Sequence, residues 1–158
     1  MSEPILVSAC LLGLRTRYDG TQRLHPEVTR FLETEGLLPI PVCPEQLAGL
    51  PTPRPSALFH SGDGDTLLDG NGELCDTSGN ELNELFLQGA EQALSIARLT
   101  GCKRALLKER SPSCGCHQVY RAGNLVSGRG VTSALLQRNA IRVISEEELQ
   151  PRSSKDHA

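Results

Sequence analysis

Short apolar runs alternate along this chain with longer amphipathic segments. Four of the runs are too short for helices, and we interpret them as buried strands at residues 5–8, 37–42, 104–108 and 141–144. Apolar positions recur at helical spacing within three further segments, residues 26–35, 82–100 and 131–138, and each segment is predicted to contain a helix. Strands that alternate with helices favour parallel pairing with right-handed crossovers. The pattern therefore predicts an α/β single domain with a Rossmann-like three-layer fold, in which helices cover both faces of a small, mostly parallel sheet.

Two of the predicted helices have recognisable ends. Pro26 suits the first turn of the first helix, because that position needs no backbone donor, and Gly36 ends its apolar pattern. Before the longest helix, Ser78 and Glu81 form a capping-box pattern, and the apolar face that follows ends before Gly101. We therefore expect the longest helix to begin close to Ser78.

Three segments fit the alternation less well. Pro39 and Pro41 lie inside the predicted strand 37–42, although proline removes backbone donors from a central strand. Residues 46–77 are rich in Gly, Pro and Asp, which predicts loops with a small hairpin. Residues 117–130 are predicted to be a turn-rich excursion.

The domain boundaries follow from the same patterns. Residues 1–145 hold all the predicted strands and long helices and form the expected domain. Residues 146–158 begin with an acidic stretch, for which we expect a short helix. The tail of about eight residues that follows offers nothing to bury, so we expect it to be disordered.

Composition and charge narrow the expected partners. The chain has 158 residues, a net charge of -3 and no basic block, so it lacks the charge pattern of nucleic-acid binders and a small-molecule substrate is expected. Three Phe, two Tyr and no Trp offer few rings on which bases could stack. No apolar run approaches the ~20 residues of a membrane span, and the N-terminus lacks a signal-peptide pattern. We therefore expect a cytoplasmic protein without a membrane partner, of unknown oligomeric state.

Six cysteines are unusual for a chain expected in the cytoplasm, where thiols stay reduced and disulfides are rare. Cys10, Cys43 and Cys114 each lie just after a predicted strand. The carboxyl ends of parallel strands share one edge of a sheet, and ligands bind beyond that edge. The sequence therefore predicts that three thiols converge there.

Three converging thiolates suit a soft metal centre. It can be zinc with one outside ligand, or an iron-sulfur cluster with one iron free of protein ligands. Because 32 residues separate Cys10 from Cys43 and 70 separate Cys43 from Cys114, the close cysteine pairs of structural zinc sites are missing. Two alternatives stay open: a non-catalytic zinc or iron-sulfur binding module, and a metal-free enzyme in which Cys114 is the nucleophile.

The other cysteines and the histidines have simpler expected roles. Cys102 is predicted to be a small buried hydrophobic residue, and Cys75, in a polar region, an inert thiol that faces solvent or is partly buried. Cys116 is close enough in sequence to the favoured ligands to offer an alternative sulfur. His117 is expected either at the surface or in contact with the metal ligands without binding the metal itself. His60 is expected in a loop.

Three oxygen-bearing side chains accompany the favoured thiols. Glu45 lies two residues after Cys43, so its carboxyl is within reach of a molecule bound at that thiol. A carboxyl in this position can transfer a proton. Ser111 and Ser113 precede Cys114, where hydroxyls can orient water or a substrate. The alternative interpretations are an exposed loop carboxylate and serines that cap a neighbouring turn.

Three blocks of sequence resemble the signature of a known family. They are VSACLLG at 7–13 with RYDG at 17–20, VCPE at 42–45 with GLPTPR at 49–54, and LKERSPSCG at 107–115. Residues 130–136 and 139–145 resemble the same family's closing helix and strand. On these blocks, which span about residues 5 to 145, the chain resembles the bacterial thiouracil desulfidase (TudS) family, formerly a domain of unknown function.

The resemblance implies an α/β domain that holds a 4Fe-4S cluster by three cysteines and removes sulfur from thiolated uracil, either 2-thiouracil or 4-thiouracil, to leave uracil. By motif position the cluster ligands are Cys10, Cys43 and Cys114. The family's catalytic carboxylate and hydroxyl correspond to Glu45 and Ser111, with Ser113 as the other candidate hydroxyl.

The resemblance also implies a hydrolytic reaction. An iron without a protein ligand is an open Lewis acid that takes the sulfur of a thiocarbonyl and receives the departing sulfide. Water attacks the carbon, while Glu45 handles a proton and Ser111 orients the water or the ring. Family members that act on transfer RNA are longer, so the implied substrate is a thiolated pyrimidine base or nucleoside. The chain departs from the family pattern at Cys116, where many relatives have a small polar residue, and Cys116 is therefore a possible competitor for iron.

Overall fold

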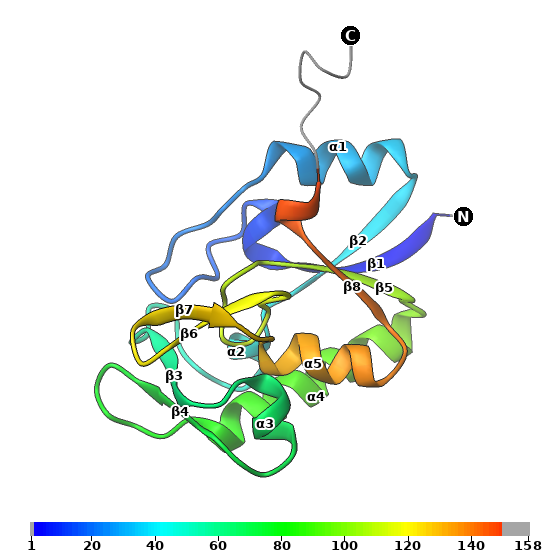
Figure 1. Cartoon of the computed structure of the whole chain (residues 1–158). Helices are drawn as coiled ribbons and strands as arrows, with labels where there is room; N and C mark the ends of the chain where they lie inside the picture. The colour runs from blue at the N-terminus through cyan, green and yellow to red at the C-terminus, as the bar shows by residue number, and fades with distance from the viewer. Residues whose placement is uncertain (1, 150–158) are drawn as a thin grey trace, which may run out of the picture.

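Four parallel strands form the central sheet, and they are the four strands that the apolar runs predict. The computed structural model describes residues 2–149. The strands lie in the order β2-β1-β5-β8, with bounds Glu3–Ser8 (β1), Leu37–Val42 (β2), Arg104–Leu107 (β5) and Arg142–Ser145 (β8). Every neighbouring pair is parallel (Figure 1). The predicted parallel sheet is confirmed.

The position of β2 at the edge of the sheet explains its prolines. Pro39 and Pro41 lie opposite Ile5 and Val7 of β1. In the described part of the chain β2 has β1 as its one neighbour, so backbone groups that face away from β1 need no partner. The edge strand therefore accommodates both prolines.

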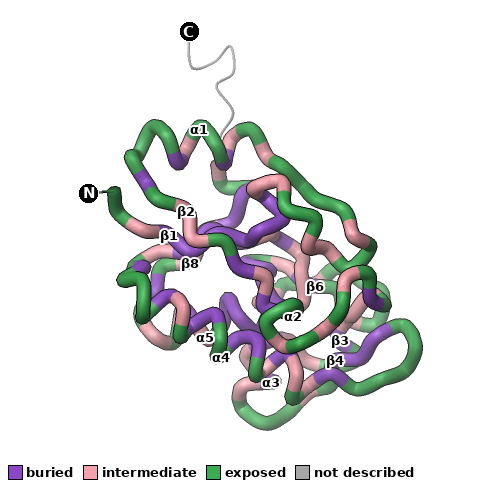
Figure 2. The backbone as a smooth tube through the Cα atoms, turned by 180° about the vertical axis from the view of Figure 1, so that it is seen from behind, coloured by how far each residue is buried: buried purple, intermediate pink, exposed green. Residues whose placement is uncertain are grey.

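Helices cover both faces of the central sheet, as predicted. They are α1 (Pro26–Thr34) on one face, with α4 (Asn83–Thr100) and α5 (Val131–Arg138) on the other (Figure 1). Successive residues of β1 point to opposite faces. Val7 belongs to the hydrophobic cluster that includes Val28 of α1, whereas Leu6 belongs to the cluster that includes Ala93 of α4. β1 is therefore enclosed from both sides, as its buried colouring in Figure 2 shows.

A second, mixed sheet was not predicted. It has the order β4-β3-β6-β7, with bounds Ala57–Ser61 (β3), Glu73–Asp76 (β4), Gln118–Arg121 (β6) and Asn124–Ser127 (β7). β3 and β4 are antiparallel, as the predicted hairpin in 46–77 requires, but α3 (Gly64–Leu68) is inserted between them. β6 and β7 form an antiparallel hairpin in the expected turn-rich excursion. The sequence signal was weak because most residues of β3, β6 and β7 are exposed or half-buried, so these strands are not apolar runs like the equally short β5.

The predicted start of the longest helix is wrong. α4 begins at Asn83, and no side chain caps it. Ser78 instead belongs to a turn in which Asp76 Oδ1 accepts the backbone N–H groups of Ser78 and Asn80, each at 2.9 Å. Glu81 is drawn into a bridge with Cys75. The polar residues that resemble a capping box therefore close a turn beside β4.

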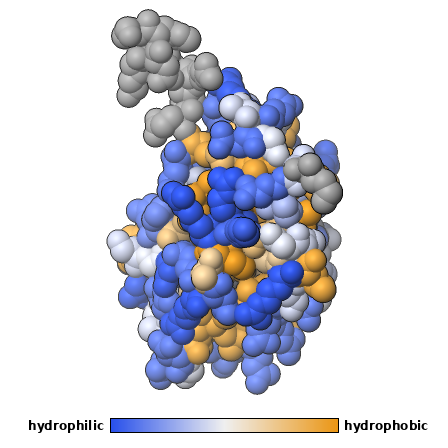
Figure 3. All heavy atoms as spheres, turned by 90° about the vertical axis from the view of Figure 1, so that its right-hand side faces the viewer, coloured by the Kyte–Doolittle hydropathy of each residue, from blue (hydrophilic) through white to orange (hydrophobic). Residues whose placement is uncertain are grey.

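Two 3-10 helices follow strands of the central sheet. η1 (Ala9–Leu12) comes directly after β1, and η2 (Glu146–Glu148) comes after β8, where a short helix was expected. The tail that we expect to be disordered lies outside the described residues. On the face shown in Figure 3, hydrophilic residues predominate and hydrophobic ones occupy smaller areas between them. Within residues 2–149 we find no helix with the length and apolar character that crossing a membrane requires.

Candidate active site

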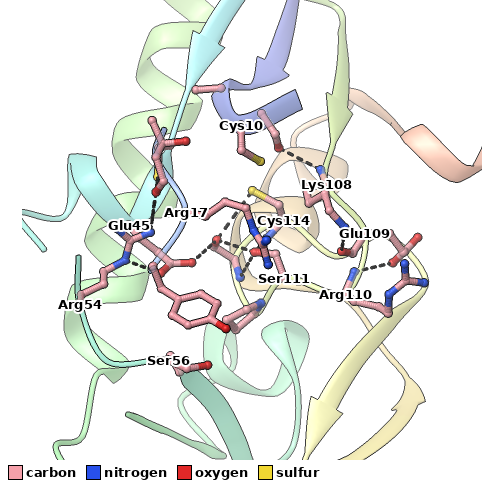
Figure 4. Close-up of a pocket in the computed structure, with 18 of the residues that line it drawn as sticks. Cys10, Arg17, Glu45, Arg54, Ser56, Lys108, Glu109, Arg110, Ser111 and Cys114 are labelled. Atoms are coloured by element: carbon pink, nitrogen blue, oxygen red, sulfur yellow. Dashed lines mark hydrogen bonds and ion pairs between the residues drawn. The ribbon is translucent and has the colours of Figure 1, made fainter. Parts of the chain in front are cut away.

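A cavity of about 440 Å³ opens at the carboxyl edge of the central sheet. The chain runs from β1 to the β2 side of the sheet and from β5 to the β8 side, so the loops after β1 and β5 diverge and leave space between them. Ala57 and Tyr120 of the second sheet form another wall. All six site residues expected from the sequence line this cavity: Cys10, Cys43, Glu45, Ser111, Ser113 and Cys114. Figure 4 labels four of them, Cys10, Glu45, Ser111 and Cys114.

Each thiol is positioned by the segment that follows its strand. Cys10 lies in η1, where its carbonyl accepts the backbone N–H of Arg23 at 2.8 Å. Cys43 directly precedes α2 (Pro44–Leu47). Cys114 lies in the turn after β5, and in Figure 4 its sulfur and that of Cys10 face the same space. The structure thus brings the three thiols to one cavity.

A glycine fixes the turn that carries Cys43 and Glu45. At Gly89 of α4 a Cβ atom would lie 2.2 Å from the carbonyl oxygen of Pro44. No other residue leaves room for that backbone, because a Cβ–oxygen approach this short is a severe clash. The α2 turn therefore rests directly on α4.

Hydrogen bonds within the turn of residues 111–114, and others between this turn and α5, hold it in place. Ser111 Oγ accepts the backbone N–H groups of Ser113 at 3.2 Å and Cys114 at 3.1 Å. The carbonyls of Pro112 and Ser113 accept the first N–H groups of α5, from Val131 at 3.0 Å and Thr132 at 2.8 Å. These carbonyls satisfy donors that every helix start leaves free. The thiol of Cys114 is therefore mounted on a rigid backbone.

The predicted carboxylate and hydroxyls form one hydrogen-bonded chain. Ser113 Oγ donates to Glu45 Oε2 at 3.2 Å, and Ser111 Oγ lies 3.0 Å from Ser113 Oγ. Ser113 is only 2% exposed, whereas Ser111 is half-buried. The three groups connect the cavity's carboxylate to its Cys114 turn, and the hydroxyl in direct contact with Glu45 is that of Ser113.

Arg54 is a cavity residue whose role the sequence analysis missed. Its buried guanidinium donates through Nε to Glu45 Oε1 at 2.9 Å, and through Nη2 to the carbonyl of Thr16 at 2.9 Å. Nη1 donates to Thr52 Oγ1 at 2.9 Å. Because its other donors anchor the planar guanidinium to Thr16 and Thr52, the Nε–H bond holds Glu45 Oε1 in a fixed position. The only earlier signal was its place at the end of the GLPTPR block.

The cavity also holds a cation with no carboxylate partner. Among its cationic residues, three form ion pairs: Arg54 with Glu45, Lys108 with Glu146, and Arg110 with Glu147. Within residues 2–149 Arg17 forms none, and its buried Nη1 atom has no hydrogen-bond partner. Its guanidinium lies 5.7 Å from the centre of the Tyr18 ring. Arg17 therefore has donor capacity left for a bound group.

Burial governs the ionisation of the three thiols. It raises the pKa of Cys10 to about 11, although the charges of Lys108 and Arg17 act in the opposite direction. It raises the pKa of Cys114 to about 12 and also raises the pKa of Cys43. These three thiols are therefore protonated at neutral pH, and binding a soft metal would release protons.

The separation of the sulfur atoms distinguishes between metal centres. A single zinc ion at about 2.3 Å from each sulfur would hold the sulfurs about 3.8 Å apart. Cys10, Cys43 and Cys114 are not among the donor groups in residues 2–149 whose atoms all lie within 4.8 Å of one another. At least two of these sulfurs therefore lie farther apart than one zinc ion would hold them, and three soft donors at that separation suit a larger centre such as an iron-sulfur cluster.

Glu109 is a second buried carboxylate that the sequence analysis missed. Its Oε1 accepts the backbone N–H groups of Cys116 and His117, each at 2.9 Å, and that of Gln118 at 3.1 Å. Burial opposes its ionisation, but these donors outweigh burial and lower the pKa of Glu109. Glu109 thus organises the loop that follows Cys114.

Within residues 2–149, the other cysteines and the histidines lie outside the cavity. Cys116 is buried in the core, and its Sγ donates to the carbonyls of Cys114 at 3.6 Å and Leu107 at 3.9 Å. Cys102 is buried as expected, and His117 is exposed beside Glu148. Two expectations are wrong. Cys75 is 5% exposed, hence buried, and His60 lies on strand β3 instead of in a loop.

Comparison with known proteins decides the family. The model of the family described as 2-thiouracil desulfurase matches residues 5–148. The chain belongs to this family. The solved structure of a [4Fe-4S]-dependent thiouracil desulfidase, TudS, is 40% identical with a TM-score of 0.79, over 94% of this chain and 93% of that one. "Uncharacterized protein YbbK" of Bacillus subtilis (strain 168) is 37% identical over 148 residues, 92% of this chain and 97% of YbbK. The family expected from the sequence blocks is confirmed.

Proposed function

We propose that this desulfurase-family protein removes sulfur from thiolated uracil, of the 2-thiouracil or 4-thiouracil type, to give uracil and sulfide. One observation carries the proposal: three thiols, a carboxylate and two serine hydroxyls from distant parts of the chain line one cavity. Membership of the 2-thiouracil desulfurase family and likeness to a [4Fe-4S]-dependent thiouracil desulfidase support it.

Cys10, Cys43 and Cys114 are the proposed ligands of a 4Fe-4S cluster. Three thiolates for four irons leave one iron without a protein ligand, and the bound cluster supplies there an open Lewis acid for the soft sulfur of a thiocarbonyl. Arg17 supports this assignment, because its unpartnered buried Nη1 can donate to an anionic group in the cavity.

Glu45 and Ser113 are the proposed catalytic pair. Arg54 fixes Oε1 of Glu45, so Oε2 is the oxygen that meets the Ser113 hydroxyl and accepts a proton from the attacking water. Ser111 extends the chain toward the cavity and orients the water or the ring. In the overall reaction, thiouracil and water give uracil and hydrogen sulfide, so the protein supplies no net electron.

The substrate is proposed to be a free thiolated base or nucleoside. The cavity volume of about 440 Å³ lies within the usual range of small-molecule sites, roughly 300–1,000 Å³. The negative net charge is unfavourable for nucleic acid. A cytoplasmic location is part of the proposal, since three reduced thiols are needed for the cluster.

The two alternatives account for less of the site. A metal-free Cys114 nucleophile needs an easily formed thiolate, but the pKa of Cys114 is raised to about 12. A module in which the thiols only hold the fold gives no reason for Glu45 to be held by both Arg54 and Ser113 at the cavity wall. The arrangement of proton-transfer groups favours an enzyme.

Turnover by matched variants tests the proposal. Protein reconstituted without oxygen is expected to release one sulfide per uracil from 2-thiouracil or 4-thiouracil. Glu45→Ala should lower kcat by about 10²–10⁴-fold with the cluster retained. Cys43→Ala should lose both cluster and turnover, whereas Cys102→Ala, a buried thiol away from the cavity, should keep both. A cluster-free Cys43→Ala protein that remains active would contradict the proposal.

A further inference from the structure

A second group of metal-ligating side chains lies on the β3–β4 pair of the second sheet. It consists of His60 on β3 with Glu73 and Cys75 on β4. Their ligand atoms all lie within 4.8 Å of one another. None of the three lines the catalytic cavity. The group is therefore separate from the three thiols already assigned.

The strand geometry explains why these side chains meet. Glu73 and Cys75 are two residues apart on β4, so they share one face of the sheet. The register of the two strands shifts between Phe59 and Ser61, and the irregularity lies at His60. A bulge of this kind re-aims a side chain, and here the imidazole reaches the carboxylate of the neighbouring strand.

The two distances from Glu73 to its neighbours in the group match those around one tetrahedral ion. His60 Nδ1 lies 3.3 Å from Glu73 Oε1, and Cys75 Sγ lies 3.4 Å from the same oxygen. Around zinc at normal bond lengths, neighbouring nitrogen and oxygen ligands lie about 3.3 Å apart, and sulfur and oxygen about 3.5 Å. The side chains could coordinate one ion with little rearrangement.

The donor set indicates zinc. A mixture of imidazole nitrogen, carboxylate oxygen and thiolate sulfur matches the ligands of a borderline-soft, four-coordinate ion. Cys75 is buried, whereas the side chains of His60 and Glu73 are 52% and 51% exposed, so an ion can enter from solvent. Glu81 pairs directly with Cys75 across a β-bridge, so its carboxylate can approach from the same face.

We propose that His60, Glu73 and Cys75 bind a Zn²⁺ ion, with Glu81 or water as the fourth ligand. On binding, the Cys75 S–H bond breaks, a Zn–S bond forms and the proton passes to solvent, without any oxidation or reduction. The ion links β3 to the edge strand β4 and stabilises the second sheet, because it binds the folded chain.

Zinc binding to the full chain tests the proposal. The protein is first loaded with its iron-sulfur cluster without oxygen, so that the cavity thiols are occupied, and is then equilibrated with Zn²⁺ and dialysed. About one zinc per chain is expected, and X-ray absorption at the zinc edge should show one sulfur among lighter ligands. His60→Gln and Cys75→Ser should each lose this zinc.

Two matched variants serve as controls. His117→Gln removes an exposed histidine that also pairs with a glutamate, and Cys102→Ser removes a buried thiol elsewhere. Both should keep the zinc. His60→Gln keeps the test valid if Cys75→Ser misfolds, because His60 is exposed. Absence of tightly bound zinc, or zinc that persists in His60→Gln with its sulfur ligand intact, would overturn the proposal whatever the turnover of thiouracil.

Discussion

At the scale of single residues, the two serines before Cys114 have different partners. Ser113 Oγ donates to Glu45, whereas Ser111 Oγ accepts the backbone N–H groups of Ser113 and Cys114. The family resemblance favoured Ser111 as the catalytic hydroxyl, with Ser113 as the other candidate. The geometry gives direct contact with the carboxylate to Ser113 and support of the Cys114 turn to Ser111.

This difference predicts separate effects of the two substitutions. Ser113→Ala should lower kcat by about 10²-fold with the cluster intact, because Glu45 loses its hydroxyl partner. Ser111→Ala should lower the free energy of unfolding by about 1 kcal/mol and reduce cluster retention, because two backbone donors lose their acceptor, and it should lower kcat less than Ser113→Ala does. Steady-state kinetics and urea titrations measure the two effects. Equal losses of kcat with no loss of stability in either variant would contradict the division of roles.

At the scale of elements, the site depends on the contact between the Cys114 turn and the start of α5. At Gly130, directly before α5, a Cβ would lie 2.5 Å from the Ser113 carbonyl carbon and 2.7 Å from the Cys114 nitrogen. Both neighbours are backbone atoms and cannot rotate away. The backbone around Cys114 therefore has to move if this residue gains a side chain.

Gly130→Ala should accordingly displace Cys114 and lower cluster occupancy in the reconstituted protein. Gly36→Ala is a suitable control, because its φ of 63° makes alanine unfavourable while nothing lies within 4 Å of the new methyl group. The control should lose about 1 kcal/mol of stability and keep its iron. If both variants keep full cluster content, the turn does not depend on this contact.

The elements that the sequence predicts are those with a strong local signal. The strands of the central sheet are apolar runs buried on both faces, as β1 shows with Ile5, Leu6 and Val7 all inaccessible. The second sheet gave no such signal, because β6 has one buried residue and β7 has none. The Ser78 pattern misled because Asp76 accepts the backbone N–H of Ser78, which a capping box would direct to the side chain of Glu81.

In the candidate site, too, the sequence predicts the residues whose position follows from the central strands and misses the others. Cys10, Cys43 and Cys114 could be expected at one edge because strand ends determine where they lie. Arg54 and Glu109 could not, since each acts through hydrogen bonds to segments that only the folded chain brings near. A buried charged residue leaves no mark in a hydrophobic pattern beyond an isolated polar position.

At the scale of the whole molecule, buried carboxylates connect the central sheet with the second sheet and the C-terminal 3-10 helix. Glu109 accepts N–H groups at the start of the β6 hairpin, and its own N–H donates to Glu146 at 2.7 Å. Lys108 in turn pairs with Glu146 at 3.2 Å. The ionised form of Glu109 therefore holds several elements together.

This network predicts a loss of stability in acid. Because the folded-state pKa of Glu109 is below its ordinary value of 4.5, its ionised form stabilises the fold above about pH 4.5, and this contribution disappears as pH falls through the folded value. Glu109→Gln should cost about 2 kcal/mol near neutral pH and flatten the acid limb. Urea titrations at several pH values measure both. Parallel stability curves for the two proteins would contradict this role of Glu109.

The iron and acid-labile sulfide content per chain of protein reconstituted without oxygen tests the central claim most directly. With three cysteine ligands and one open iron, about four of each per chain are expected. Cys10→Ala, Cys43→Ala and Cys114→Ala should each lose them, whereas Cys75→Ala and Cys102→Ala should keep them. Zinc in place of iron at the cavity thiols, or a thiouracil-converting protein without iron, would contradict the account.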